Sequence, residues 1–166
     1  LNQIKVDTGA KIKIGVVIPL TGKLALTGQK VLQGIQLAVH QLPFQAREKL
    51  ALEVRDSGHQ LPMKEIIADL SGLPNVVGII GPLLSDEVAI AGKVARDYLI
   101  PIFSPSASTY GLVDENSFMF RNALTREIQA KFLAEYAVNT LKLKRFAVLH
   151  PYEPFGLELK DTFIKE

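Results

Sequence analysis

The chain has 166 residues, of which 48% are hydrophobic and 22% are charged, a composition typical of one or two ordinary folded domains with a core of useful size. Its formal net charge is only +2 and its basic residues are scattered, which argues against nucleic acid as a partner. Cysteine is absent, which excludes disulfides, thiolate metal sites and a cysteine nucleophile. No apolar run approaches the roughly 18 residues of a membrane span.

Short apolar runs alternate with amphipathic stretches from Ile12 onward. The runs predict strands over residues 12–19, 50–54, 76–80, 99–103, 117–121 and 145–149. Apolar residues at helical spacing predict helices over residues 28–41, 62–70, 86–95, 125–141 and 155–166, with Thr125 as an N-cap. This alternation is typical of βαβ units, so we predict an α/β fold with a parallel sheet.

Two hydroxyl-rich or small-residue loops, residues 81–85 and residues 104–109, follow the third and fourth predicted strands. Ligands of open α/β sheets bind outside the carboxyl ends of the strands, and a helix N-terminus there favours an anionic group. The pattern therefore suits a small polar ligand. Two alternatives stay open: Ser85 either only caps its helix or also faces the ligand, and the hydroxyls of residues 104–109 either satisfy their own backbone or contact the ligand.

The motifs of nucleotide-binding proteins and hydrolases do not occur. Residues 21–24 read Thr-Gly-Lys-Leu, without the hydroxyl residue after the lysine and the earlier glycine that a P-loop needs. No GxGxxG follows a predicted strand, and Ser85 lies in Gly-Pro-Leu-Leu-Ser rather than in the GxSxG of a nucleophile elbow.

The ionisable residues do not predict catalysis either. Asp56 stands at a strand end, as the phospho-acceptor of a receiver domain does, but the acidic pair that should follow the first strand is not there. His40, His59 and His150 lie in three different elements, so we interpret them as solvated histidines rather than metal ligands or bases. We predict no enzyme activity, no catalytic residue, no metal and no cofactor.

Taken in order, several motifs resemble those of the type I periplasmic binding proteins, and the leucine/isoleucine/valine-binding group is the most similar branch. The motifs are IGVVIPLTG, RDSG, VVGIIGPLLS, IPIFSPSAS, FMFRNALT, KRFAVLHP and a closing FG. The resemblance implies a three-layer α/β/α lobe, and a second lobe of which most lies outside this chain, with the two lobes closing on a ligand. On this basis residues 1–11 are a lead-in, residues 12–124 the first lobe, and residues 125–166 the hinge crossing and the start of the second lobe.

The same resemblance implies a ligand-binding site in this chain. Ser85 matches the serine after the third strand, Ser106 to Ser108 fall in the Ser-Pro-x-Ala-Thr loop, and Phe155 replaces the tyrosine that opens a helix of the second lobe. Thr27 stands where many members place an aromatic ring over the ligand. The predicted ligand-binding residues are Thr27, Ser85, Ser106, Ala107, Ser108 and Phe155.

The resemblance further implies an extracytoplasmic solute-binding protein of an ABC-type transporter. Its ligand would be an amino acid or a related small carboxylate in the cleft between the lobes, and its protein partner an ABC permease. The location would be the periplasm or another extracytoplasmic space, with the signal or lipoprotein segment outside this chain.

A second group with the same fold offers an alternative. GQKVLQGIQLA, GPLLSDE and FRNALT with the following Gln129 are also similar to the penicillin-binding protein activators. Those are envelope lipoproteins that regulate peptidoglycan synthesis by contact, so this resemblance implies a peptidoglycan synthase as the partner.

Apolar residues near the end of the chain carry one more expectation. Without a complete second lobe they would be exposed, and an unpaired strand edge can pair with another chain. We expect this 166-residue chain to self-associate or to be poorly ordered in its C-terminal part. The residues concerned are Phe146, Val148, Leu149, Phe163 and Ile164.

Overall fold

The computed structural model describes residues 11–58, 61–109, 111–112 and 118–166, and these divide into two compact units. Unit 1 contains the described residues up to Ala107 and those from Gly111 to Asn122. Unit 2 contains Ser108, Thr109 and residues from Ala123 to Glu166.

Unit 1 is built on a five-stranded sheet with the order β2-β1-β3-β4-β5, in which every neighbouring pair is parallel. The α/β prediction and the first five predicted strands are confirmed. The strands are β1 (Ile12–Ile18), β2 (Leu50–Asp56), β3 (Val76–Ile80), β4 (Ile102–Ser104) and β5 (Met119–Arg121).

The fourth strand begins three residues later than we predicted. Leu99 ends the preceding helix in the left-handed conformation, with φ of 56°, and therefore cannot begin a strand. Pro101 has no amide proton to give to the sheet. Its carbonyl nevertheless accepts a hydrogen bond from the Ile79 amide at 2.9 Å, so the chain joins the sheet before the formal strand starts at Ile102.

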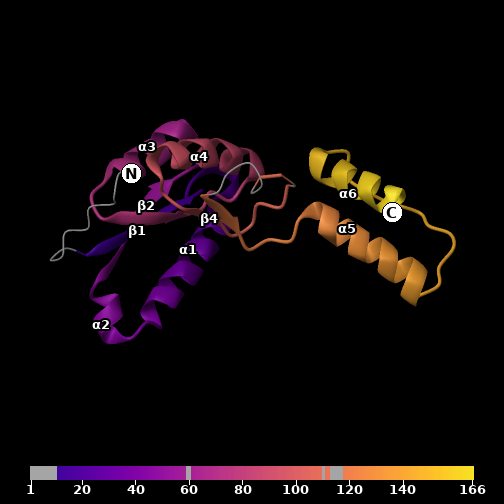
Figure 1. Ribbon diagram of the computed structural model, residues 1–166, viewed down its shortest axis with the longest axis horizontal. Coiled ribbons are helices and arrows are strands. Elements are labelled where there is room, and N and C mark those ends of the chain that lie inside the picture. Colours follow the sequence, from indigo (N-terminus) through magenta and orange to yellow (C-terminus); the bar gives the residue numbers. More distant parts are fainter. Residues whose placement is uncertain (1–10, 59–60, 110, 113–117) are drawn as a thin grey trace. The chain divides into compact units, whose positions relative to one another are not determined.

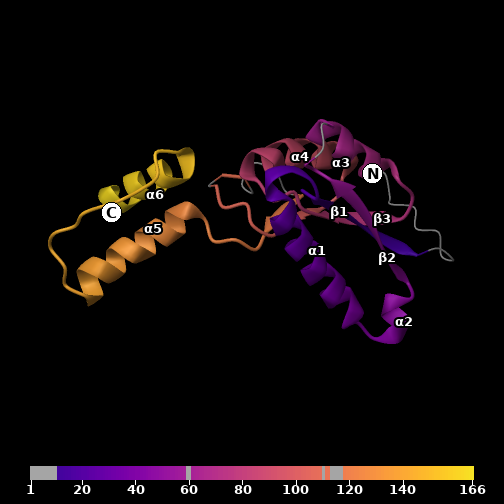
Figure 2. The same cartoon turned by 180° about the vertical axis from the view of Figure 1, so that it is seen from behind.

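Helices cover both faces of the sheet, as a parallel sheet requires. Helix α1 lies on one face, and α3 and α4 lie on the other (Figures 1 and 2). The short α2 has no apolar periodicity of its own and was not predicted. The helical elements of unit 1 are the 3₁₀ turn η1 (Gly22–Leu24), α1 (Ala25–His40), α2 (Phe44–Arg47), α3 (Met63–Gly72) and α4 (Ser85–Tyr98).

Strand β1 joins the two cores because successive side chains point to opposite faces. Val17 lies in the core beneath α3 and α4, whereas Val16 and Ile18 pack with apolar residues of α1, and all three side chains are fully buried. This explains why β1 from Ile14 to Ile18 is a continuous apolar run rather than an alternating one.

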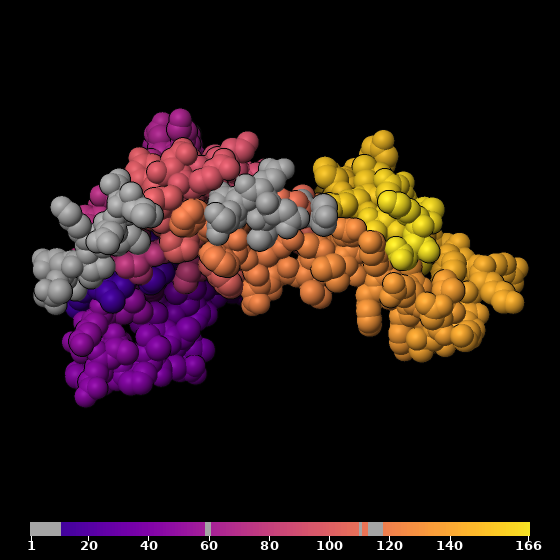
Figure 3. Space-filling model, in the orientation of Figure 1, coloured from indigo at the N-terminus to yellow at the C-terminus, as the bar shows by residue number. Residues whose placement is uncertain are grey.

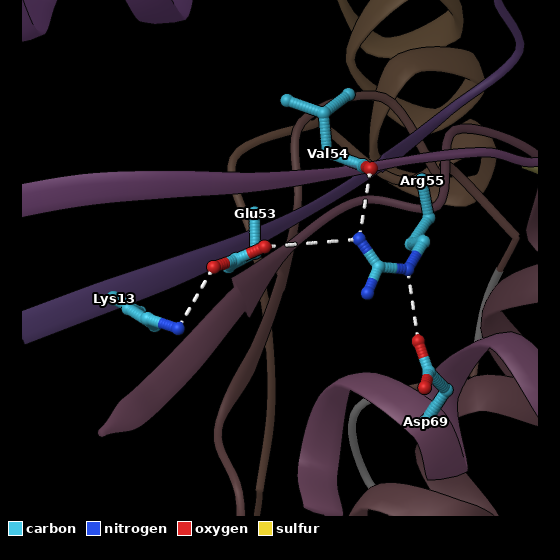
Figure 4. Close-up of polar contacts among 5 residues, drawn as sticks. All are labelled: Lys13, Glu53, Val54, Arg55 and Asp69. Atoms are coloured by element: carbon cyan, nitrogen blue, oxygen red, sulfur yellow. Dashed lines mark hydrogen bonds and ion pairs between the residues drawn. The ribbon is translucent and has the colours of Figure 1, made fainter. Parts of the chain in front are cut away.

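The edge strand β2 alternates between apolar and charged residues in its second half, from Leu52 to Arg55. Figure 4 shows Glu53 between Lys13 of β1 and Arg55, with Nζ of Lys13 at 2.9 Å from the carboxylate. Arg55 also donates from Nε to Asp69 of α3 at 2.8 Å, which connects the sheet edge to the helix (Figure 4). Each pair is partly exposed, so each contributes little stability.

Two glycines allow close approaches at the carboxyl edge of the sheet. A Cβ on Gly28 would lie 1.8 Å from the carbonyl oxygen of Pro19, so only glycine lets α1 approach the end of β1 this closely. Gly81, after β3, has a φ of +100°, and a Cβ there would lie 1.9 Å from the carbonyl oxygen of Val17.

Unit 2 is a pair of helices joined by a long connection, coloured orange to yellow in Figure 3. Helix α5 (Arg126–Glu135) continues into a π-helical turn, η2 (Tyr136–Thr140), and the chain ends with α6 (Pro154–Lys165), which packs against α5. Thr125 is the N-cap of α5, as predicted, because its Oγ1 accepts a hydrogen bond from the Ile128 amide at 3.1 Å.

The predicted strand at residues 145–149 is wrong, since this segment has no regular secondary structure. A strand needs a neighbour for its amides and carbonyls, and the described residues of unit 2 include no strand to pair with it. Phe146 packs edge-on against Phe163 with ring centroids 5.6 Å apart, whereas Leu149 is fully exposed and Ile164 largely so. Self-association through these side chains stays a prediction.

Among the residues that the structure describes, no helix is both long and apolar enough to cross a membrane.

We predict that Gly28→Ala destabilises the protein by about 1 to 3 kcal/mol, because the new methyl group forces α1 away from Pro19. Gly34→Ala is the matched control in the same helix: a Cβ there meets nothing within 4 Å, so it should stabilise by about 0.5 to 1 kcal/mol. Urea unfolding followed by circular dichroism measures both free energies. Equal effects of the two substitutions would contradict the close approach.

Candidate ligand-binding site

Ser85 is the first residue of α4 and is half-buried. The N-cap position belongs to Leu84, and no side-chain hydrogen bond caps this helix, so Ser85 is not the N-cap. The carboxylate of Glu87 reaches back to the Leu84 amide instead. Burial, helped by the negative charge of Asp86, raises the pKa of Glu87 above its ordinary value in spite of that hydrogen bond.

The loop after β4 is fastened to the loop after β3 by two serine hydroxyls. Ser104 is fully buried and donates to the carbonyl of Pro82 at 2.8 Å, and Ser106 donates to the carbonyl of Leu83 at the same distance. The Oγ of Ser104 also accepts from the Ala107 amide at 3.2 Å. The two predicted loops therefore meet at the carboxyl edge of the sheet, as their positions after neighbouring strands indicated.

These bonds limit what the loop can offer to a ligand. Because Ser106 already donates its hydroxyl proton to Leu83, its hydroxyl and carbonyl oxygens are left as hydrogen-bond acceptors. The side chain of Ala107 is buried in the core, and its amide donates to the Ser104 hydroxyl oxygen. Only the carbonyl of Ala107 therefore remains for a ligand. Residues 106 and 107 can thus recognise a donor such as an ammonium group.

Thr27 lies in the first turn of α1 and is exposed. The loop that leads from β1 to α1 is anchored by Asp56. The carboxylate of Asp56 accepts from the amides of Leu20 at 2.6 Å and Gly58 at 2.8 Å, and from the hydroxyl of Thr21 at 2.7 Å. Asp56 is therefore a fixed acceptor at the sheet edge.

Two opposing effects act on the ionisation of Asp56. Partial burial acts to raise its pKa, but the hydrogen bonds from Thr21, Leu20 and Gly58 outweigh burial and hold the pKa below its ordinary value of 3.8. The charged form is therefore the one that the fold stabilises.

Ser108 and Phe155 lie in unit 2 and are connected by a residue that the sequence did not single out. Arg126, the first residue of α5, donates from Nε to the Ser108 hydroxyl at 3.3 Å, and its guanidinium carbon lies 5.1 Å from the centroid of the Phe155 ring. Glu158 of α6 completes the cluster by binding Nη1 of Arg126 at 2.7 Å. One feature of the sequence could have identified Arg126: it follows a threonine N-cap directly, at a helix start where a cation opposes the helix dipole.

The histidines make separate contacts. His40 lies 3.3 Å from Nη1 of Arg47, and His150 lies 3.0 Å from the carbonyl of Pro151, while His59 lies outside the described residues. In the part of the chain that the structure describes, no group of three or more histidine, cysteine or acidic residues could hold a metal ion.

The model of the family described as "Periplasmic binding protein" matches residues 11–166 of this chain. The chain belongs to this family. Among curated relatives, the Leu/Ile/Val-binding protein BraC3 of Rhizobium johnstonii is 28% identical over 163 residues, which cover 93% of this chain and 43% of the relative. This periplasmic binding protein chain therefore spans less than half the length of the curated relatives it matches.

Solved structures agree on the fold. The branched-chain amino acid transporter substrate-binding protein LivJ of Streptococcus pneumoniae, in complex with isoleucine, superposes with a TM-score of 0.77 at 22% identity, covering 93% of this chain and 46% of that one. A solute-binding protein of an ABC transporter from Rhodopseudomonas palustris, in complex with 3,4-dihydroxybenzoic acid, gives 0.75 at 19% identity, covering 93% and 44%. The type I periplasmic binding protein fold, predicted from the sequence, is confirmed.

We predict that Asp56→Asn costs about 1 kcal/mol at pH 7, because the neutral amide loses the charge that the three donors stabilise. The folded pKa is the lower one, so this contribution is present above pH 3.8 and is lost as the pH falls through the folded pKa. The stability gap between the variant and the parent should thus close below pH 3.8 in urea titrations.

Asp69→Asn is the control, since Asp69 forms a more exposed pair with Arg55 and should change stability by less than about 0.5 kcal/mol. A gap between the Asp56 variant and the parent that is constant from pH 7 to pH 3 would contradict the role of the carboxylate charge.

Proposed function

We propose that the protein containing this chain is an extracytoplasmic solute-binding protein of an ABC-type transporter that binds an amino acid or a related small carboxylate. The observation that carries the proposal is the joining of the loops after β3 and β4 by Ser104 and Ser106 at the carboxyl edge of the sheet. Ligands of open α/β sheets bind at this edge. Membership of the periplasmic binding protein family also supports a solute-binding function.

The chemistry of the loops suggests which groups would be recognised. Ser85 and the amides that begin α4 would donate to a carboxylate, since the first amides of a helix have no partner within it. The carbonyls of Ser106 and Ala107 would accept from an ammonium group. Ser108 and Phe155 are proposed as further contacts of the ligand. Thr27 is proposed as a contact as well; its side chain is smaller than the aromatic ring that many family members have at this position, and would leave more room for the ligand.

The relatives favour a carboxylate as the common feature of the ligand. BraC3 is named for leucine, isoleucine and valine, and the two solved structures hold isoleucine and 3,4-dihydroxybenzoic acid. All of these compounds carry a carboxylate, whereas only the amino acids carry an ammonium group. The carboxylate is therefore the group that these ligands share, whereas the ammonium group is present in only some of them.

The partner that follows from this role is an ABC permease, and the place is the periplasm or another extracytoplasmic space. Residues 12–124 would form the first lobe, and residues 125–166 the hinge crossing and the start of the second. The alternative, contact regulation of a peptidoglycan synthase by an envelope lipoprotein, requires no ligand.

We predict that a thermal-shift screen of the full-length protein finds a small carboxylate that raises the melting temperature, because a ligand bound by the folded state stabilises it. Ser85→Ala should weaken the binding of that compound about 10- to 100-fold, as expected for loss of a hydrogen bond to a charged group. Isothermal titration measures the change in Kd.

Ser71→Ala is the matched control. Its hydroxyl is buried without a hydrogen-bond partner in the last turn of α3. This helix end leads to the start of β3, at the opposite edge of the sheet, so removal of the hydroxyl should leave the Kd unchanged. If no amino acid or other small carboxylate shifts the melting temperature at millimolar concentration, the solute-binding proposal is wrong and the contact role is favoured.

A further inference from the structure

Arg126 occupies a position in α5 that does not favour a cation. It is the first residue of the helix, where the unpaired amides give the helix its positive end. Thr125 already caps this end through the Ile128 amide, so Arg126 is not needed as a cap. The arginine therefore opposes the helix dipole, and its place is explained by contacts outside α5.

Those contacts come from α6 and hold the guanidinium group from two sides. Glu158 accepts from Nη1 at 2.7 Å, and the Phe155 ring lies under the guanidinium carbon at 5.1 Å. Phe155 and Glu158 are three residues apart, so both lie on the same face of α6. Only 14% of the Arg126 side chain is exposed, which makes the group a well-fixed cation rather than a mobile surface arginine.

The fixed guanidinium group acts on Ser108. Nε of Arg126 donates to the Ser108 hydroxyl oxygen at 3.3 Å, and the Arg126 amide donates to the Ser108 carbonyl at 3.1 Å. A serine hydroxyl has one proton and two lone pairs, so the arginine occupies one acceptor position and leaves the proton to be donated. A hydroxyl that accepts from a cation also becomes a better donor, because hydrogen bonds in a chain polarise one another.

We propose that Arg126 is a positioning residue for ligand binding, which orients and polarises the Ser108 hydroxyl so that it donates to an anionic oxygen of the ligand. Glu158 and Phe155 hold Arg126 in place for this task. The inference rests on the proposed solute-binding function and adds to it a residue that determines affinity for the carboxylate. Arg126 acts through Ser108 and does not itself touch the ligand.

The test is a double-mutant cycle on the full-length protein, with Kd measured by isothermal titration. L-Leucine, L-isoleucine and 3,4-dihydroxybenzoate are tried in turn, and the first that binds is the probe. Arg126→Lys keeps a cation for Glu158 but lacks the Nε donor. It should weaken binding about tenfold in the parent, and less than about twofold when Ser108 is already alanine. Ser108→Thr keeps the hydroxyl and should restore the full tenfold effect of Arg126→Lys.

Two controls separate positioning from general stability. Lys131→Gln removes an exposed ion pair with Glu127 on the same helix and should leave the Kd unchanged. If L-leucine or L-isoleucine is the probe, the corresponding amide, which lacks the anionic oxygen, should lose the sensitivity to Arg126→Lys. If Arg126→Lys does not fold, Glu158→Gln takes its place in the cycle. It removes the carboxylate that holds Arg126 in place, so it should weaken binding in the parent and have little effect when Ser108 is already alanine.

Additive effects of the Arg126 and Ser108 substitutions would overturn this inference while the proposed function stands. An unchanged Kd in Arg126→Lys would overturn it as well. Absence of binding of all three probes to the unsubstituted protein would overturn the inference together with solute binding of this ligand class.

Discussion

The candidate site depends on how two neighbouring loops satisfy their backbone groups at the carboxyl edge of the sheet. Parallel strands β3 and β4 end side by side, so the loops that follow them begin next to each other, beyond the last hydrogen bonds of the sheet. Ser104 and Ser106 solve this problem by donating to the carbonyls of Pro82 and Leu83. The same bonds determine which groups remain for a ligand, so the architecture of the loops and their binding capacity have one cause.

Each unit contains a charged side chain that is held by several contacts, and the two charges have opposite signs. In unit 1 the β1–α1 loop is held by the Asp56 carboxylate, whose three main donors are amides and a hydroxyl. In unit 2 the central charge is the guanidinium group of Arg126, and its partners are a carboxylate, a ring and a hydroxyl. Both charges are fixed by several contacts at once, which is how a protein prepares polar groups before a ligand arrives.

The strands of the sheet could be predicted from the sequence because they are short apolar runs between loops. The cap at Thr125 could be predicted because capping depends on a few neighbouring residues. The segment at residues 145–149 has the same apolar character and yet forms no strand. A strand also needs a neighbouring strand for its hydrogen bonds, and the residues of the segment alone do not determine whether one is present.

The candidate site, too, could be predicted only in part from the sequence. The hydroxyl loops could be located from their places after two strands, but the commitment of the Ser106 hydroxyl to Leu83 is visible only in three dimensions. Arg126 and Glu158 are 32 residues apart in the chain, so no local pattern links them. Ser85 was expected to cap α4, whereas Leu84 holds that position and Glu87 binds its amide.

The most direct test of the account is a ¹H–¹⁵N correlation spectrum of the full-length protein during titration with L-isoleucine. We predict saturable shifts of the amides of residues 84–86 and 106–108, with the amides at the end of α3 unchanged. Saturable shifts confined to other parts of the protein, with these amides unmoved, would contradict a ligand site on the loops after β3 and β4.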